Sequence, residues 1–324
     1  MTYSSCVGYI AIVAKKTPGS KKRQLLTREK WLERMSYGQR QRLRFFESKL
    51  LWEGRVTRGD VHAQFGVTKN HFSREVSEYR RFFASNFEYD AWIRGYRPKA
   101  TFRPAFATGQ PEEYLALLRL CAVMPSAPIV AELGALVPTA IPEEPTSKID
   151  QKTLAAILRA IHGAGGVAIR YQSFSQDTPS SRTVWPRALI WSGERWYVRV
   201  FDSQRHAYIS LALQRILAST ASTEALPKEA GTDTEWENTE WVEVIPNPAL
   251  PEMQRRAVAH EYGMAEDKSG YVWRVRLRQC LVSYFLNRYR LDDLGPPKTR
   301  GKVPAQRIVV RDPEIVKKYA FPGD

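Results

Sequence analysis

A run of hydrogen-bond donors occupies one face of the segment from Thr68 to Phe83. Such side chains donate to base edges in the major groove of DNA and to phosphate oxygens. Helical spacing turns them away from Phe72, Val76 and Tyr79, which recur at three- and four-residue steps. We therefore predict a helix that reads DNA bases. The residues predicted to contact DNA from this helix are Thr68, Lys69, Asn70, His71, Ser73, Arg74, Ser77 and Arg81.

A basic hairpin is predicted to follow, with strands at Phe87–Asp90 and Tyr96–Phe102. Arg94, Arg97 and Lys99 lie on or near their connection, where cations contact phosphate and supply affinity and register rather than sequence information. The hairpin would then be the wing of a DNA-binding domain. The alternative is a three-helix unit that mediates protein contacts.

An aromatic ring stands beside a guanidinium in the predicted strand Arg195–Phe201. Alternation places Tyr197 and Arg199 on one face of this strand and Val198 on the other. Such a pair can stack on a base and hold a phosphate. It can equally be a structural cation and aromatic pair.

Three arginines, Arg274, Arg276 and Arg278, fall on one face of a predicted strand. Two hypotheses remain open for them. They form a rim of salt bridges, or they form a second wall of an anion site that is completed across a dimer. The carboxylates available for the salt bridges are Glu261, Glu266 and Asp267.

The parts of common enzyme sites are missing from the sequence. No Walker loop, Rossmann glycine fingerprint or Gly-x-Ser-x-Gly elbow occurs, and the histidines are dispersed without the paired spacing of a zinc site. The three cysteines are too far apart for a metal knuckle and odd in number, which rules out a disulfide framework and indicates a reducing cytoplasm. We expect no enzyme, no metal and no cofactor. The histidines are His62, His71, His162, His206 and His260, and the cysteines are Cys6, Cys121 and Cys280.

Positive charge is concentrated in the first third of the chain. The 324 residues carry a net charge of +15, and residues 1–103 hold 22 Lys or Arg against 9 Asp or Glu. An excess of this size favours a polyanionic partner such as nucleic acid. The longest apolar run, Val7–Ala14, is too short to span a bilayer, so we expect no membrane role.

The elements that must position the basic residues form a helix-turn-helix. A first helix is predicted from Gly38 to Glu53, and a short second helix begins in the capping-box-like sequence after Thr57 and stops at Gly66. The helix capped by Thr68 follows. A helix, a tight turn and a second helix with polar N-terminal residues is the geometry that enters a major groove.

The rest of the chain is predicted to contain a small β domain and a C-terminal domain. A helix spans residues 111–123, a proline-rich linker follows, and a domain boundary is expected near residue 150. After a helix around Leu154–Ile161, strand-like alternation predicts a strongly bent barrel. Its predicted strands are Val167–Phe174, Arg182–Trp191, Arg195–Phe201 and Ala207–Leu213. The C-terminal elements are a helix at Pro251–Tyr262, a strand at Tyr271–Arg278, and a helix with packing positions at Leu281, Tyr284, Phe285 and Arg288.

A series of short motifs resembles one family when it is taken in order. The motifs in and around the predicted barrel are Tyr171-Gln-Ser-Phe-Ser175, Arg182 with Pro186, Arg195-Trp-Tyr-Val198 and Leu213-Gln-Arg-Ile216. Those outside it are Ser73 with Glu75 and Tyr79, Tyr89-Asp90 and Tyr96, Pro248 to Arg255, Tyr262-Gly-Met264, and Arg278 with Leu281 and Tyr284. Together they resemble the three-part WYL repressors found beside phage-defence operons of the BREX and CBASS kinds, over about residues 31–315. Two positions depart from the family pattern: Arg187 stands where His is frequent, and Glu75 stands where Asp is common.

The resemblance implies an α+β chain: an N-terminal winged helix-turn-helix, a central Sm-like WYL β-barrel that senses a ligand, and a C-terminal α/β dimerisation domain. The domains are expected at 31–105, 151–222 and 223–324, with an N-terminal extension at 1–30 and a linker with a helix at 106–150. Hydroxyls, an aromatic platform and guanidinium groups on one face suit a nucleotide or oligonucleotide ligand. The expected ligand-binding residues are Tyr171, Ser173, Arg182, Arg187, Tyr197, Arg199, Arg215, Arg274, Arg276 and Arg278.

The chain is expected to be a homodimeric, cytoplasmic and nucleoid-associated repressor. Its ligand is expected to alter its affinity for a palindromic double-stranded operator. The alternative is an Sm-like protein that binds RNA or single-stranded nucleic acid and regulates nothing. A palindromic site upstream of the chain's own operon would favour the repressor.

Overall fold

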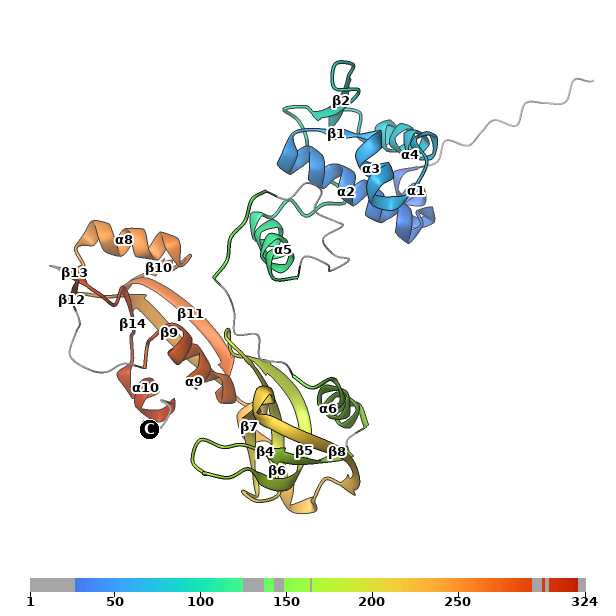
Figure 1. The fold of residues 1–324 in the computed structure, drawn as a ribbon. Helices are drawn as coiled ribbons and strands as arrows, with labels where there is room; N and C mark the ends of the chain where they lie inside the picture. Colours follow the sequence, from blue (N-terminus) through green and yellow to red (C-terminus); the bar gives the residue numbers. More distant parts are fainter. Residues whose placement is uncertain are drawn as a thin grey trace, which may run out of the picture. The chain divides into compact units, whose positions relative to one another are not determined.

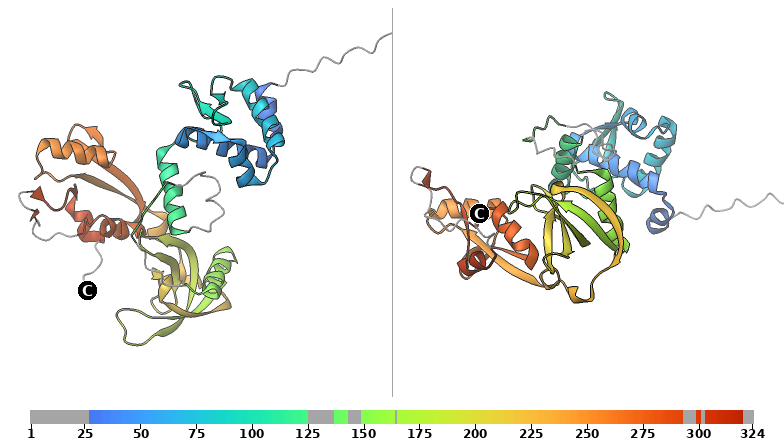
Figure 2. Two further views of the ribbon diagram at one scale, coloured as in Figure 1. Left: turned by 45° about the horizontal axis from the view of Figure 1, so that its top comes forward. Right: turned by 60° about the horizontal axis from the view of Figure 1, so that its bottom comes forward.

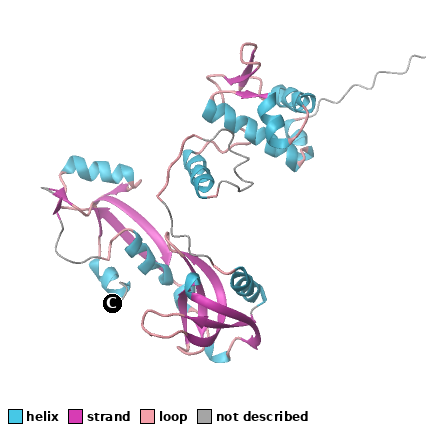
Figure 3. Ribbon diagram, viewed as in Figure 1, coloured by secondary structure: helices cyan, strands magenta, loops and turns pink. Residues whose placement is uncertain are grey.

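The computed structural model describes residues 27–124, 137–142, 149–163, 165–292, 299–300 and 303–319. The chain divides into two compact units, before and after the junction of residues 143 and 144. Each unit is described by itself. Figure 3 shows helices dominating the first unit and two sheets dominating the second.

The first unit is a winged helix-turn-helix (Figure 1). Three helices precede the wing in the predicted order, with a short additional helix before them and a two-residue strand between the first and second of the three. The helices are α1 (Arg28–Arg34), α2 (Tyr37–Glu53), α3 (Arg58–Phe65) and α4 (Lys69–Phe82). The strands are β1 (Val56–Thr57), β2 (Phe87–Asp90) and β3 (Gly95–Pro98), in the antiparallel order β1-β3-β2. The second wing strand therefore ends at Pro98 rather than at Phe102.

Local sequence determines where these helices begin and end. Thr57 and Asp60 form a reciprocal capping box at the start of α3, and Gly66 ends that helix in a left-handed conformation with φ of 67°. Thr68 caps α4 by accepting a hydrogen bond from the His71 amide. These signals fix the tight turn between the two helices.

An aromatic core holds the wing and the helices together. The Phe46 ring of α2 is fully buried and lies within 6.0 Å of four other rings, measured between centroids. Two of those rings belong to α4 and two to the wing, so burial of one side chain joins all three elements. The four rings are those of Phe72, Tyr79, Phe87 and Tyr96. Helix α5 (Pro111–Val123), with Pro at its first position as predicted, packs on α2 through the stacked rings of Trp52 and Tyr114.

The second unit begins with helix α6 (Gln151–Gly163) and a five-stranded antiparallel sheet of order β7-β6-β5-β4-β8. Its strands are β4 (Gly165–Tyr171), β5 (Ser180–Trp191), β6 (Trp196–Asp202), β7 (Ala207–Ala212) and β8 (Ile216–Ala225), with the 3-10 turn η2 (Leu213–Arg215) before the last. The strands curve strongly (Figure 2), but in the described residues β7 and β8 remain the edges of an open sheet. The closed barrel is therefore not confirmed. β8, which the sequence did not predict, is largely exposed and rich in Ala, Ser and Thr, so it offers little apolar surface to seal a closed interior.

The C-terminal part is a second sheet with helices on one face. Its sheet has the order β10-β11-β9-β14, built from β9 (Thr239–Pro246), β10 (Ala265–Asp267), β11 (Gly270–Arg278) and β14 (Ile308–Val310). The covering helices are α8 (Glu252–Glu261), α9 (Gln279–Arg288) and α10 (Pro313–Tyr319), whose apolar residues pack with Val242 and Val244 of β9. Minor elements are η3 (Lys228–Ala230), α7 (Thr234–Glu237), β12 (Thr299–Arg300) and β13 (Val303–Pro304). No described helix is both long and apolar enough to cross a bilayer.

Candidate nucleic-acid interface and ligand cavity

Helix α4 presents the predicted polar face to solvent. Phe72, Val76 and Tyr79 are buried, and the opposite face is exposed except for Ser73, which is half-buried. The exposed members of the predicted DNA-contacting set are Thr68, Lys69, Asn70, His71, Arg74, Ser77 and Arg81.

The two serines of this face are already hydrogen-bonded within the domain. Ser73 Oγ donates to the Lys69 carbonyl at 2.8 Å and accepts from Arg58 Nη1 at 3.3 Å, while Ser77 Oγ donates to the Ser73 carbonyl at 2.8 Å. Hydroxyls that bond back into their own helix have less capacity for bases. The four amide and cationic side chains of the face are therefore better placed to read DNA. They are Lys69, Asn70, Arg74 and Arg81.

An ion-pair network fixes α4 on α2. Arg42 Nε donates to Glu75 Oε2 at 2.9 Å, and this hydrogen bond raises the pKa of Arg42. His71 Nε2 lies 3.1 Å from Glu75 Oε1, so the imidazole is tied to the same carboxylate although half of its side chain is exposed. In the sequence, Glu75 stands out only as a motif position of the resembled family, with Glu where Asp is common. The structure makes it the buried partner that orients the helix.

A second buried carboxylate, that of Glu47 in α2, binds α4 on its buried face. It accepts hydrogen bonds from the Tyr79 hydroxyl at 2.6 Å and from three successive backbone amides, of which that of Phe106 is the closest at 2.6 Å. Burial, followed by the negative charge of Glu47, raises the pKa of Tyr79, so the hydroxyl remains a donor. The segment after the wing is thereby bonded to the same residue as the reading helix.

The wing carries the three predicted phosphate contacts. Arg94 is exposed at the turn with a φ of 49°, and Lys99 is exposed just after β3. Arg97 Nε lies 2.7 Å from Asp90 Oδ2 across the hairpin, and its side chain remains half exposed. Arg97 therefore has an intramolecular partner that it must share with any phosphate.

A cavity of about 730 Å³ lies between the curved sheet and helix α9. It has the size of a small-ligand site. Four of the predicted ligand-binding residues meet in its wall, namely Tyr171, Ser173, Tyr197 and Arg215. The wall also contains residues that sequence analysis did not select, namely Phe174, Ser175, Ser192, Glu194, Arg195, Arg205, Ser210, Tyr284, Asn287 and Arg288. Three of them, Tyr284, Asn287 and Arg288, come from α9 in the C-terminal part.

The cavity is cationic and aromatic. Four arginines and one glutamate line it, and the Arg215 guanidinium lies 3.5 Å from the centroid of the exposed Phe174 ring. The rings of Tyr197 and Tyr284 meet with their centroids 4.8 Å apart. Burial raises the pKa of both hydroxyls, that of Tyr284 to about 12, so both are protonated donors at neutral pH. This lining suits an anion that bears a ring.

Arg182 and Arg199 do not line this cavity, although the sequence predicted that they would face the ligand. Arg182 Nη1 lies 2.9 Å from the buried Asp202 carboxylate, and its guanidinium covers the Tyr171 ring at 5.1 Å. Arg199 is only 4% exposed and donates through Nε and Nη2 to Asp233 and through Nη2 to Glu235. Burial lowers the pKa of Arg199, but its bonds to Asp233 more than offset this and leave the pKa raised. Both faces of β6 are packed, so alternation alone could not separate a ligand face from a core face.

The remaining predicted ligand-binding arginines also lie away from the cavity wall. Arg187 pairs with Glu237 and lies over Trp236. Arg274 pairs with Glu243 and Asp267, Arg276 donates to Thr239 Oγ1, and Arg278 donates to the Trp236 carbonyl. The three β11 arginines do share one face, as predicted, opposite Glu243, Trp241 and Thr239 of β9. Of the three carboxylates predicted as salt-bridge partners, Asp267 pairs with Arg274. The other partner of Arg274 is Glu243, which the sequence analysis did not name.

In the described residues, no group of three or more His, Cys, Asp or Glu side chains could hold a metal ion. The fold, the exposed face of α4 and the cavity define a winged-helix protein with a curved sheet, a cavity beside that sheet, and a C-terminal α/β domain.

Comparison with known sequences agrees with this architecture. The family profile described as the BrxR transcriptional regulator winged helix-turn-helix domain matches residues 38–120, the WYL domain matches residues 152–221, and the BrxR C-terminal dimerization domain matches residues 239–316. Three relatives are each called "DNA-binding transcriptional repressor CapW". Those of Pseudomonas aeruginosa and Escherichia coli (strain KTE188) are both 30% identical, over 79% of this chain and 84% of the relative. That of Stenotrophomonas maltophilia is 28% identical, over 88% of this chain and 93% of the relative. The chain belongs to the CapW family of WYL-domain transcriptional repressors.

Proposed function

We propose that this chain is a homodimeric repressor that binds double-stranded operator DNA through α4 and the wing and thereby silences a phage-defence operon. The observation that carries the proposal is the α4 face, where exposed cationic and amide side chains stand on a helix that the Arg42–Glu75 pair and the Glu47 carboxylate hold in place. A rigid support lets a reading helix hold its side chains at fixed positions in a groove. The name of the CapW relatives supports the same reading.

Two copies would place two α4 helices on successive major-groove half-sites, which predicts a palindromic operator. The description of the matching profile supports dimerisation through residues 239–316. The proposal places the protein on chromosomal DNA in the cytoplasm and assigns it no catalytic role.

We further propose that the cavity binds a nucleotide or a short nucleic-acid strand and that this changes operator affinity. Guanidinium groups suit phosphate, and the Phe174 and Tyr197 rings suit a stacked base. Because α9 of the C-terminal part supplies one wall, an occupant would touch both the WYL sheet and the dimerising part. The strand order, with the two edge strands joined through η2, supports an Sm-like arrangement. For the ligand to alter DNA binding, it must prefer one of two dimer shapes.

The test of the proposal starts from the full-length protein and a pool of random duplexes. Selection by binding should enrich a palindrome, and the same palindrome should occur upstream of the gene that encodes the chain. Sedimentation should give a dimer, and a reporter behind that site should be repressed. Tighter binding of single strands or RNA than of the selected duplex, in competition, would overturn the proposal in favour of an Sm-like RNA-binding protein.

A further inference from the structure

The tip of the wing carries a tryptophan in water. Trp92 lies in the turn between β2 and β3 and is 95% exposed, more than any other large hydrophobic side chain in the described residues. An indole ring carries a large apolar surface that proteins usually bury at least in part. Its full exposure at a hairpin tip makes it available to a partner.

Hydrogen bonds hold this tip in a defined shape. The Asp90 carboxylate accepts from the Trp92 amide through Oδ1 at 2.8 Å and pairs with Arg97 Nε through Oδ2 at 2.7 Å. One side chain therefore fixes both the turn and the strand that leaves it.

The base of the hairpin is fixed as tightly. A Cβ atom at Gly95 would come within 2.6 Å of the Val56 carbonyl oxygen, so glycine is needed where β3 passes β1. Behind it, Phe87 and Tyr96 pack into the aromatic core. The ring is thus presented on a short, supported arm.

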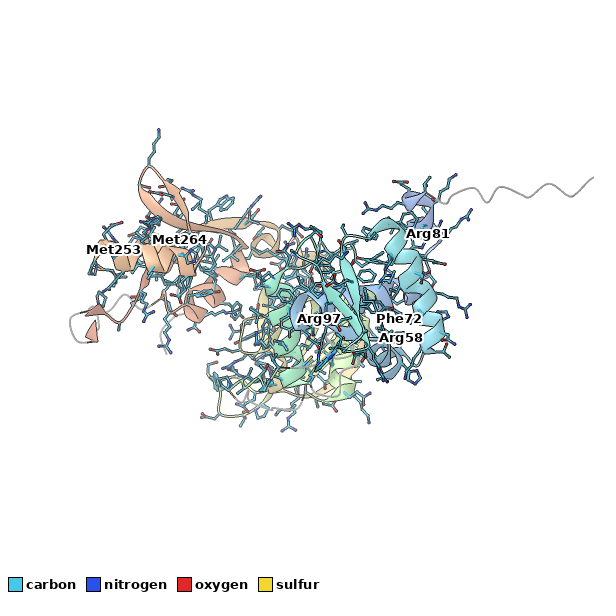
Figure 4. All side chains as sticks on the ribbon, turned by 90° about the horizontal axis from the view of Figure 1, so that it is seen from above. Arg58, Phe72, Arg81, Arg97, Met253 and Met264 are labelled. Carbon is cyan, nitrogen blue, oxygen red and sulfur yellow. The ribbon has the colours of Figure 1, made fainter. Side chains whose placement is uncertain are left out.

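The surroundings of the ring identify the partner. Arg94 at the turn and Arg97 in β3 are exposed cations of the same hairpin, and the Arg80 guanidinium of α4 lies 5.0 Å from the Phe87 ring, so the wing adjoins α4. Figure 4 looks down on this face, with Arg97 on the hairpin and Arg81 on α4. A flat apolar ring at the tip of a hairpin that also carries guanidinium groups, next to the helix proposed to enter a major groove, is matched by the adjoining minor groove of the same duplex. A protein partner would need an acidic surface that also accommodates α4.

We propose that Trp92 is a wedge that enters the minor groove beside the α4 site and partly unstacks one base-pair step, while Arg94 and Arg97 hold the flanking phosphates. Apolar side chains on minor-groove binders act in this way and bend the duplex. The cost of unstacking depends on the step, and pyrimidine–purine steps yield most easily. Trp92 would therefore select for deformable DNA at a position that no side chain reads by hydrogen bonds. This inference rests on the proposed DNA-binding function.

The experiment uses full-length wild type, Trp92→Ala, Trp92→Phe and, as the matched control, Arg94→Ala. The probe is the duplex selected from the random pool by wild type, with adenines near the outer edges of each half-site replaced one at a time by 2-aminopurine, whose fluorescence rises on unstacking. Affinity is measured as a function of salt concentration. A melting curve for each variant checks the fold. Because the Trp92 ring is exposed, its replacement should leave the melting temperature unchanged.

Wild type and Trp92→Phe should raise the fluorescence at one position in each half-site. Trp92→Ala should remove that signal and weaken binding about tenfold or more, with the salt slope unchanged because no charge is lost. Arg94→Ala should keep the fluorescence signal and flatten the slope by about 0.9.

If Trp92→Ala keeps both the affinity and the fluorescence signal of wild type, the wedge is overturned and the repressor assignment stays intact. A wild type that binds no duplex at all would overturn both, which separates the two failures.

Discussion

The Arg199 guanidinium and the Asp233 carboxylate form a buried bidentate pair, with Nε to Oδ2 at 2.9 Å and Nη2 to Oδ1 at 2.7 Å. Arg199 lies in the middle of β6, whereas Asp233 caps the short helix α7 that leads into the C-terminal sheet. The pair therefore ties the WYL sheet to the segment that follows it. Its loss would leave a charge without a partner in the protein interior.

Arg199→Ala is expected to destabilise the second unit by about 3–5 kcal/mol, because removal of one member of a buried pair strands the other. Arg199→Lys should recover little, since an ammonium cannot make the bidentate contact. Thermal melts of the full chain measure the effect. Arg195→Ala, which removes a partly exposed guanidinium just before β6, is the control and should melt like wild type. Equal melting of the Arg199 and Arg195 variants would show that the buried pair contributes nothing.

The sequence alone could not show that Arg199 holds a buried ion pair while Arg195 lines the cavity. Alternation correctly placed Arg199 opposite Val198, but its partner Asp233 comes from a later segment, and pairing between distant charges leaves no periodic signal. The same holds for the cavity wall supplied by α9. Tyr284 and Arg288 look like packing positions of a helix until tertiary structure brings them beside Tyr197 and Gly193. The residue types and the family resemblance predicted an anion site, and only the fold decides which cations line it.

Arg215→Ala and Arg288→Ala are expected to abolish the response to ligand while leaving the fold and operator binding intact. Each removes one guanidinium from the cavity wall, and neither interrupts a buried ion pair in the described residues. The measurement is the melting temperature, together with operator affinity, in the presence of a panel of cyclic nucleotides and short oligonucleotides, because a ligand that binds only the folded state raises the melting temperature. Arg170→Ala removes an exposed guanidinium from β4, beside Tyr171 but outside the cavity, and should respond like wild type. A full response in both cavity variants would place the ligand elsewhere.

The winged helix was far more predictable than the sensor. Thr57, Gly66 and Thr68 act within a few residues of themselves, so the ends of α3 and the start of α4 are encoded locally. The second wing strand ends before Phe102 because the chain turns after Lys99. The Lys99 amide donates to the Asn86 carbonyl, just before β2, and the Phe102 amide donates back to the Lys99 carbonyl. The buried Glu47 and Glu75 carboxylates were missed as supports, since a glutamate in a basic helix reads as a surface residue until its partners are known.

Arg74→Ala is expected to weaken binding to the selected duplex by about 1–3 kcal/mol, and to affect random duplex far less, if the guanidinium donates two hydrogen bonds to a base edge. The residue is exposed in the second turn of α4, on the same face as Asn70 and Ser77. Competition of labelled selected duplex with unlabelled random duplex gives both affinities at one salt concentration. Arg170→Ala, in the second unit and outside the cavity, serves as a control for loss of one positive charge. Equal weakening on the two duplexes would assign Arg74 to phosphate instead.

Arg97→Ala and Lys99→Ala are expected to differ in their effect on salt dependence, although both remove one positive charge from the wing. Lys99 has an exposed ammonium group that can neutralise a phosphate fully, so its loss should flatten the slope of log affinity against log salt by about 0.9. Arg97 already shares its guanidinium with Asp90, so fewer counterions are released when it meets DNA and its slope change should be smaller. Asp90→Asn tests this directly: it frees Arg97, and the slope of that variant should become steeper than that of wild type. The slopes come from binding titrations of the selected duplex over a series of salt concentrations. Identical slopes in all three variants and wild type would place the wing off the DNA.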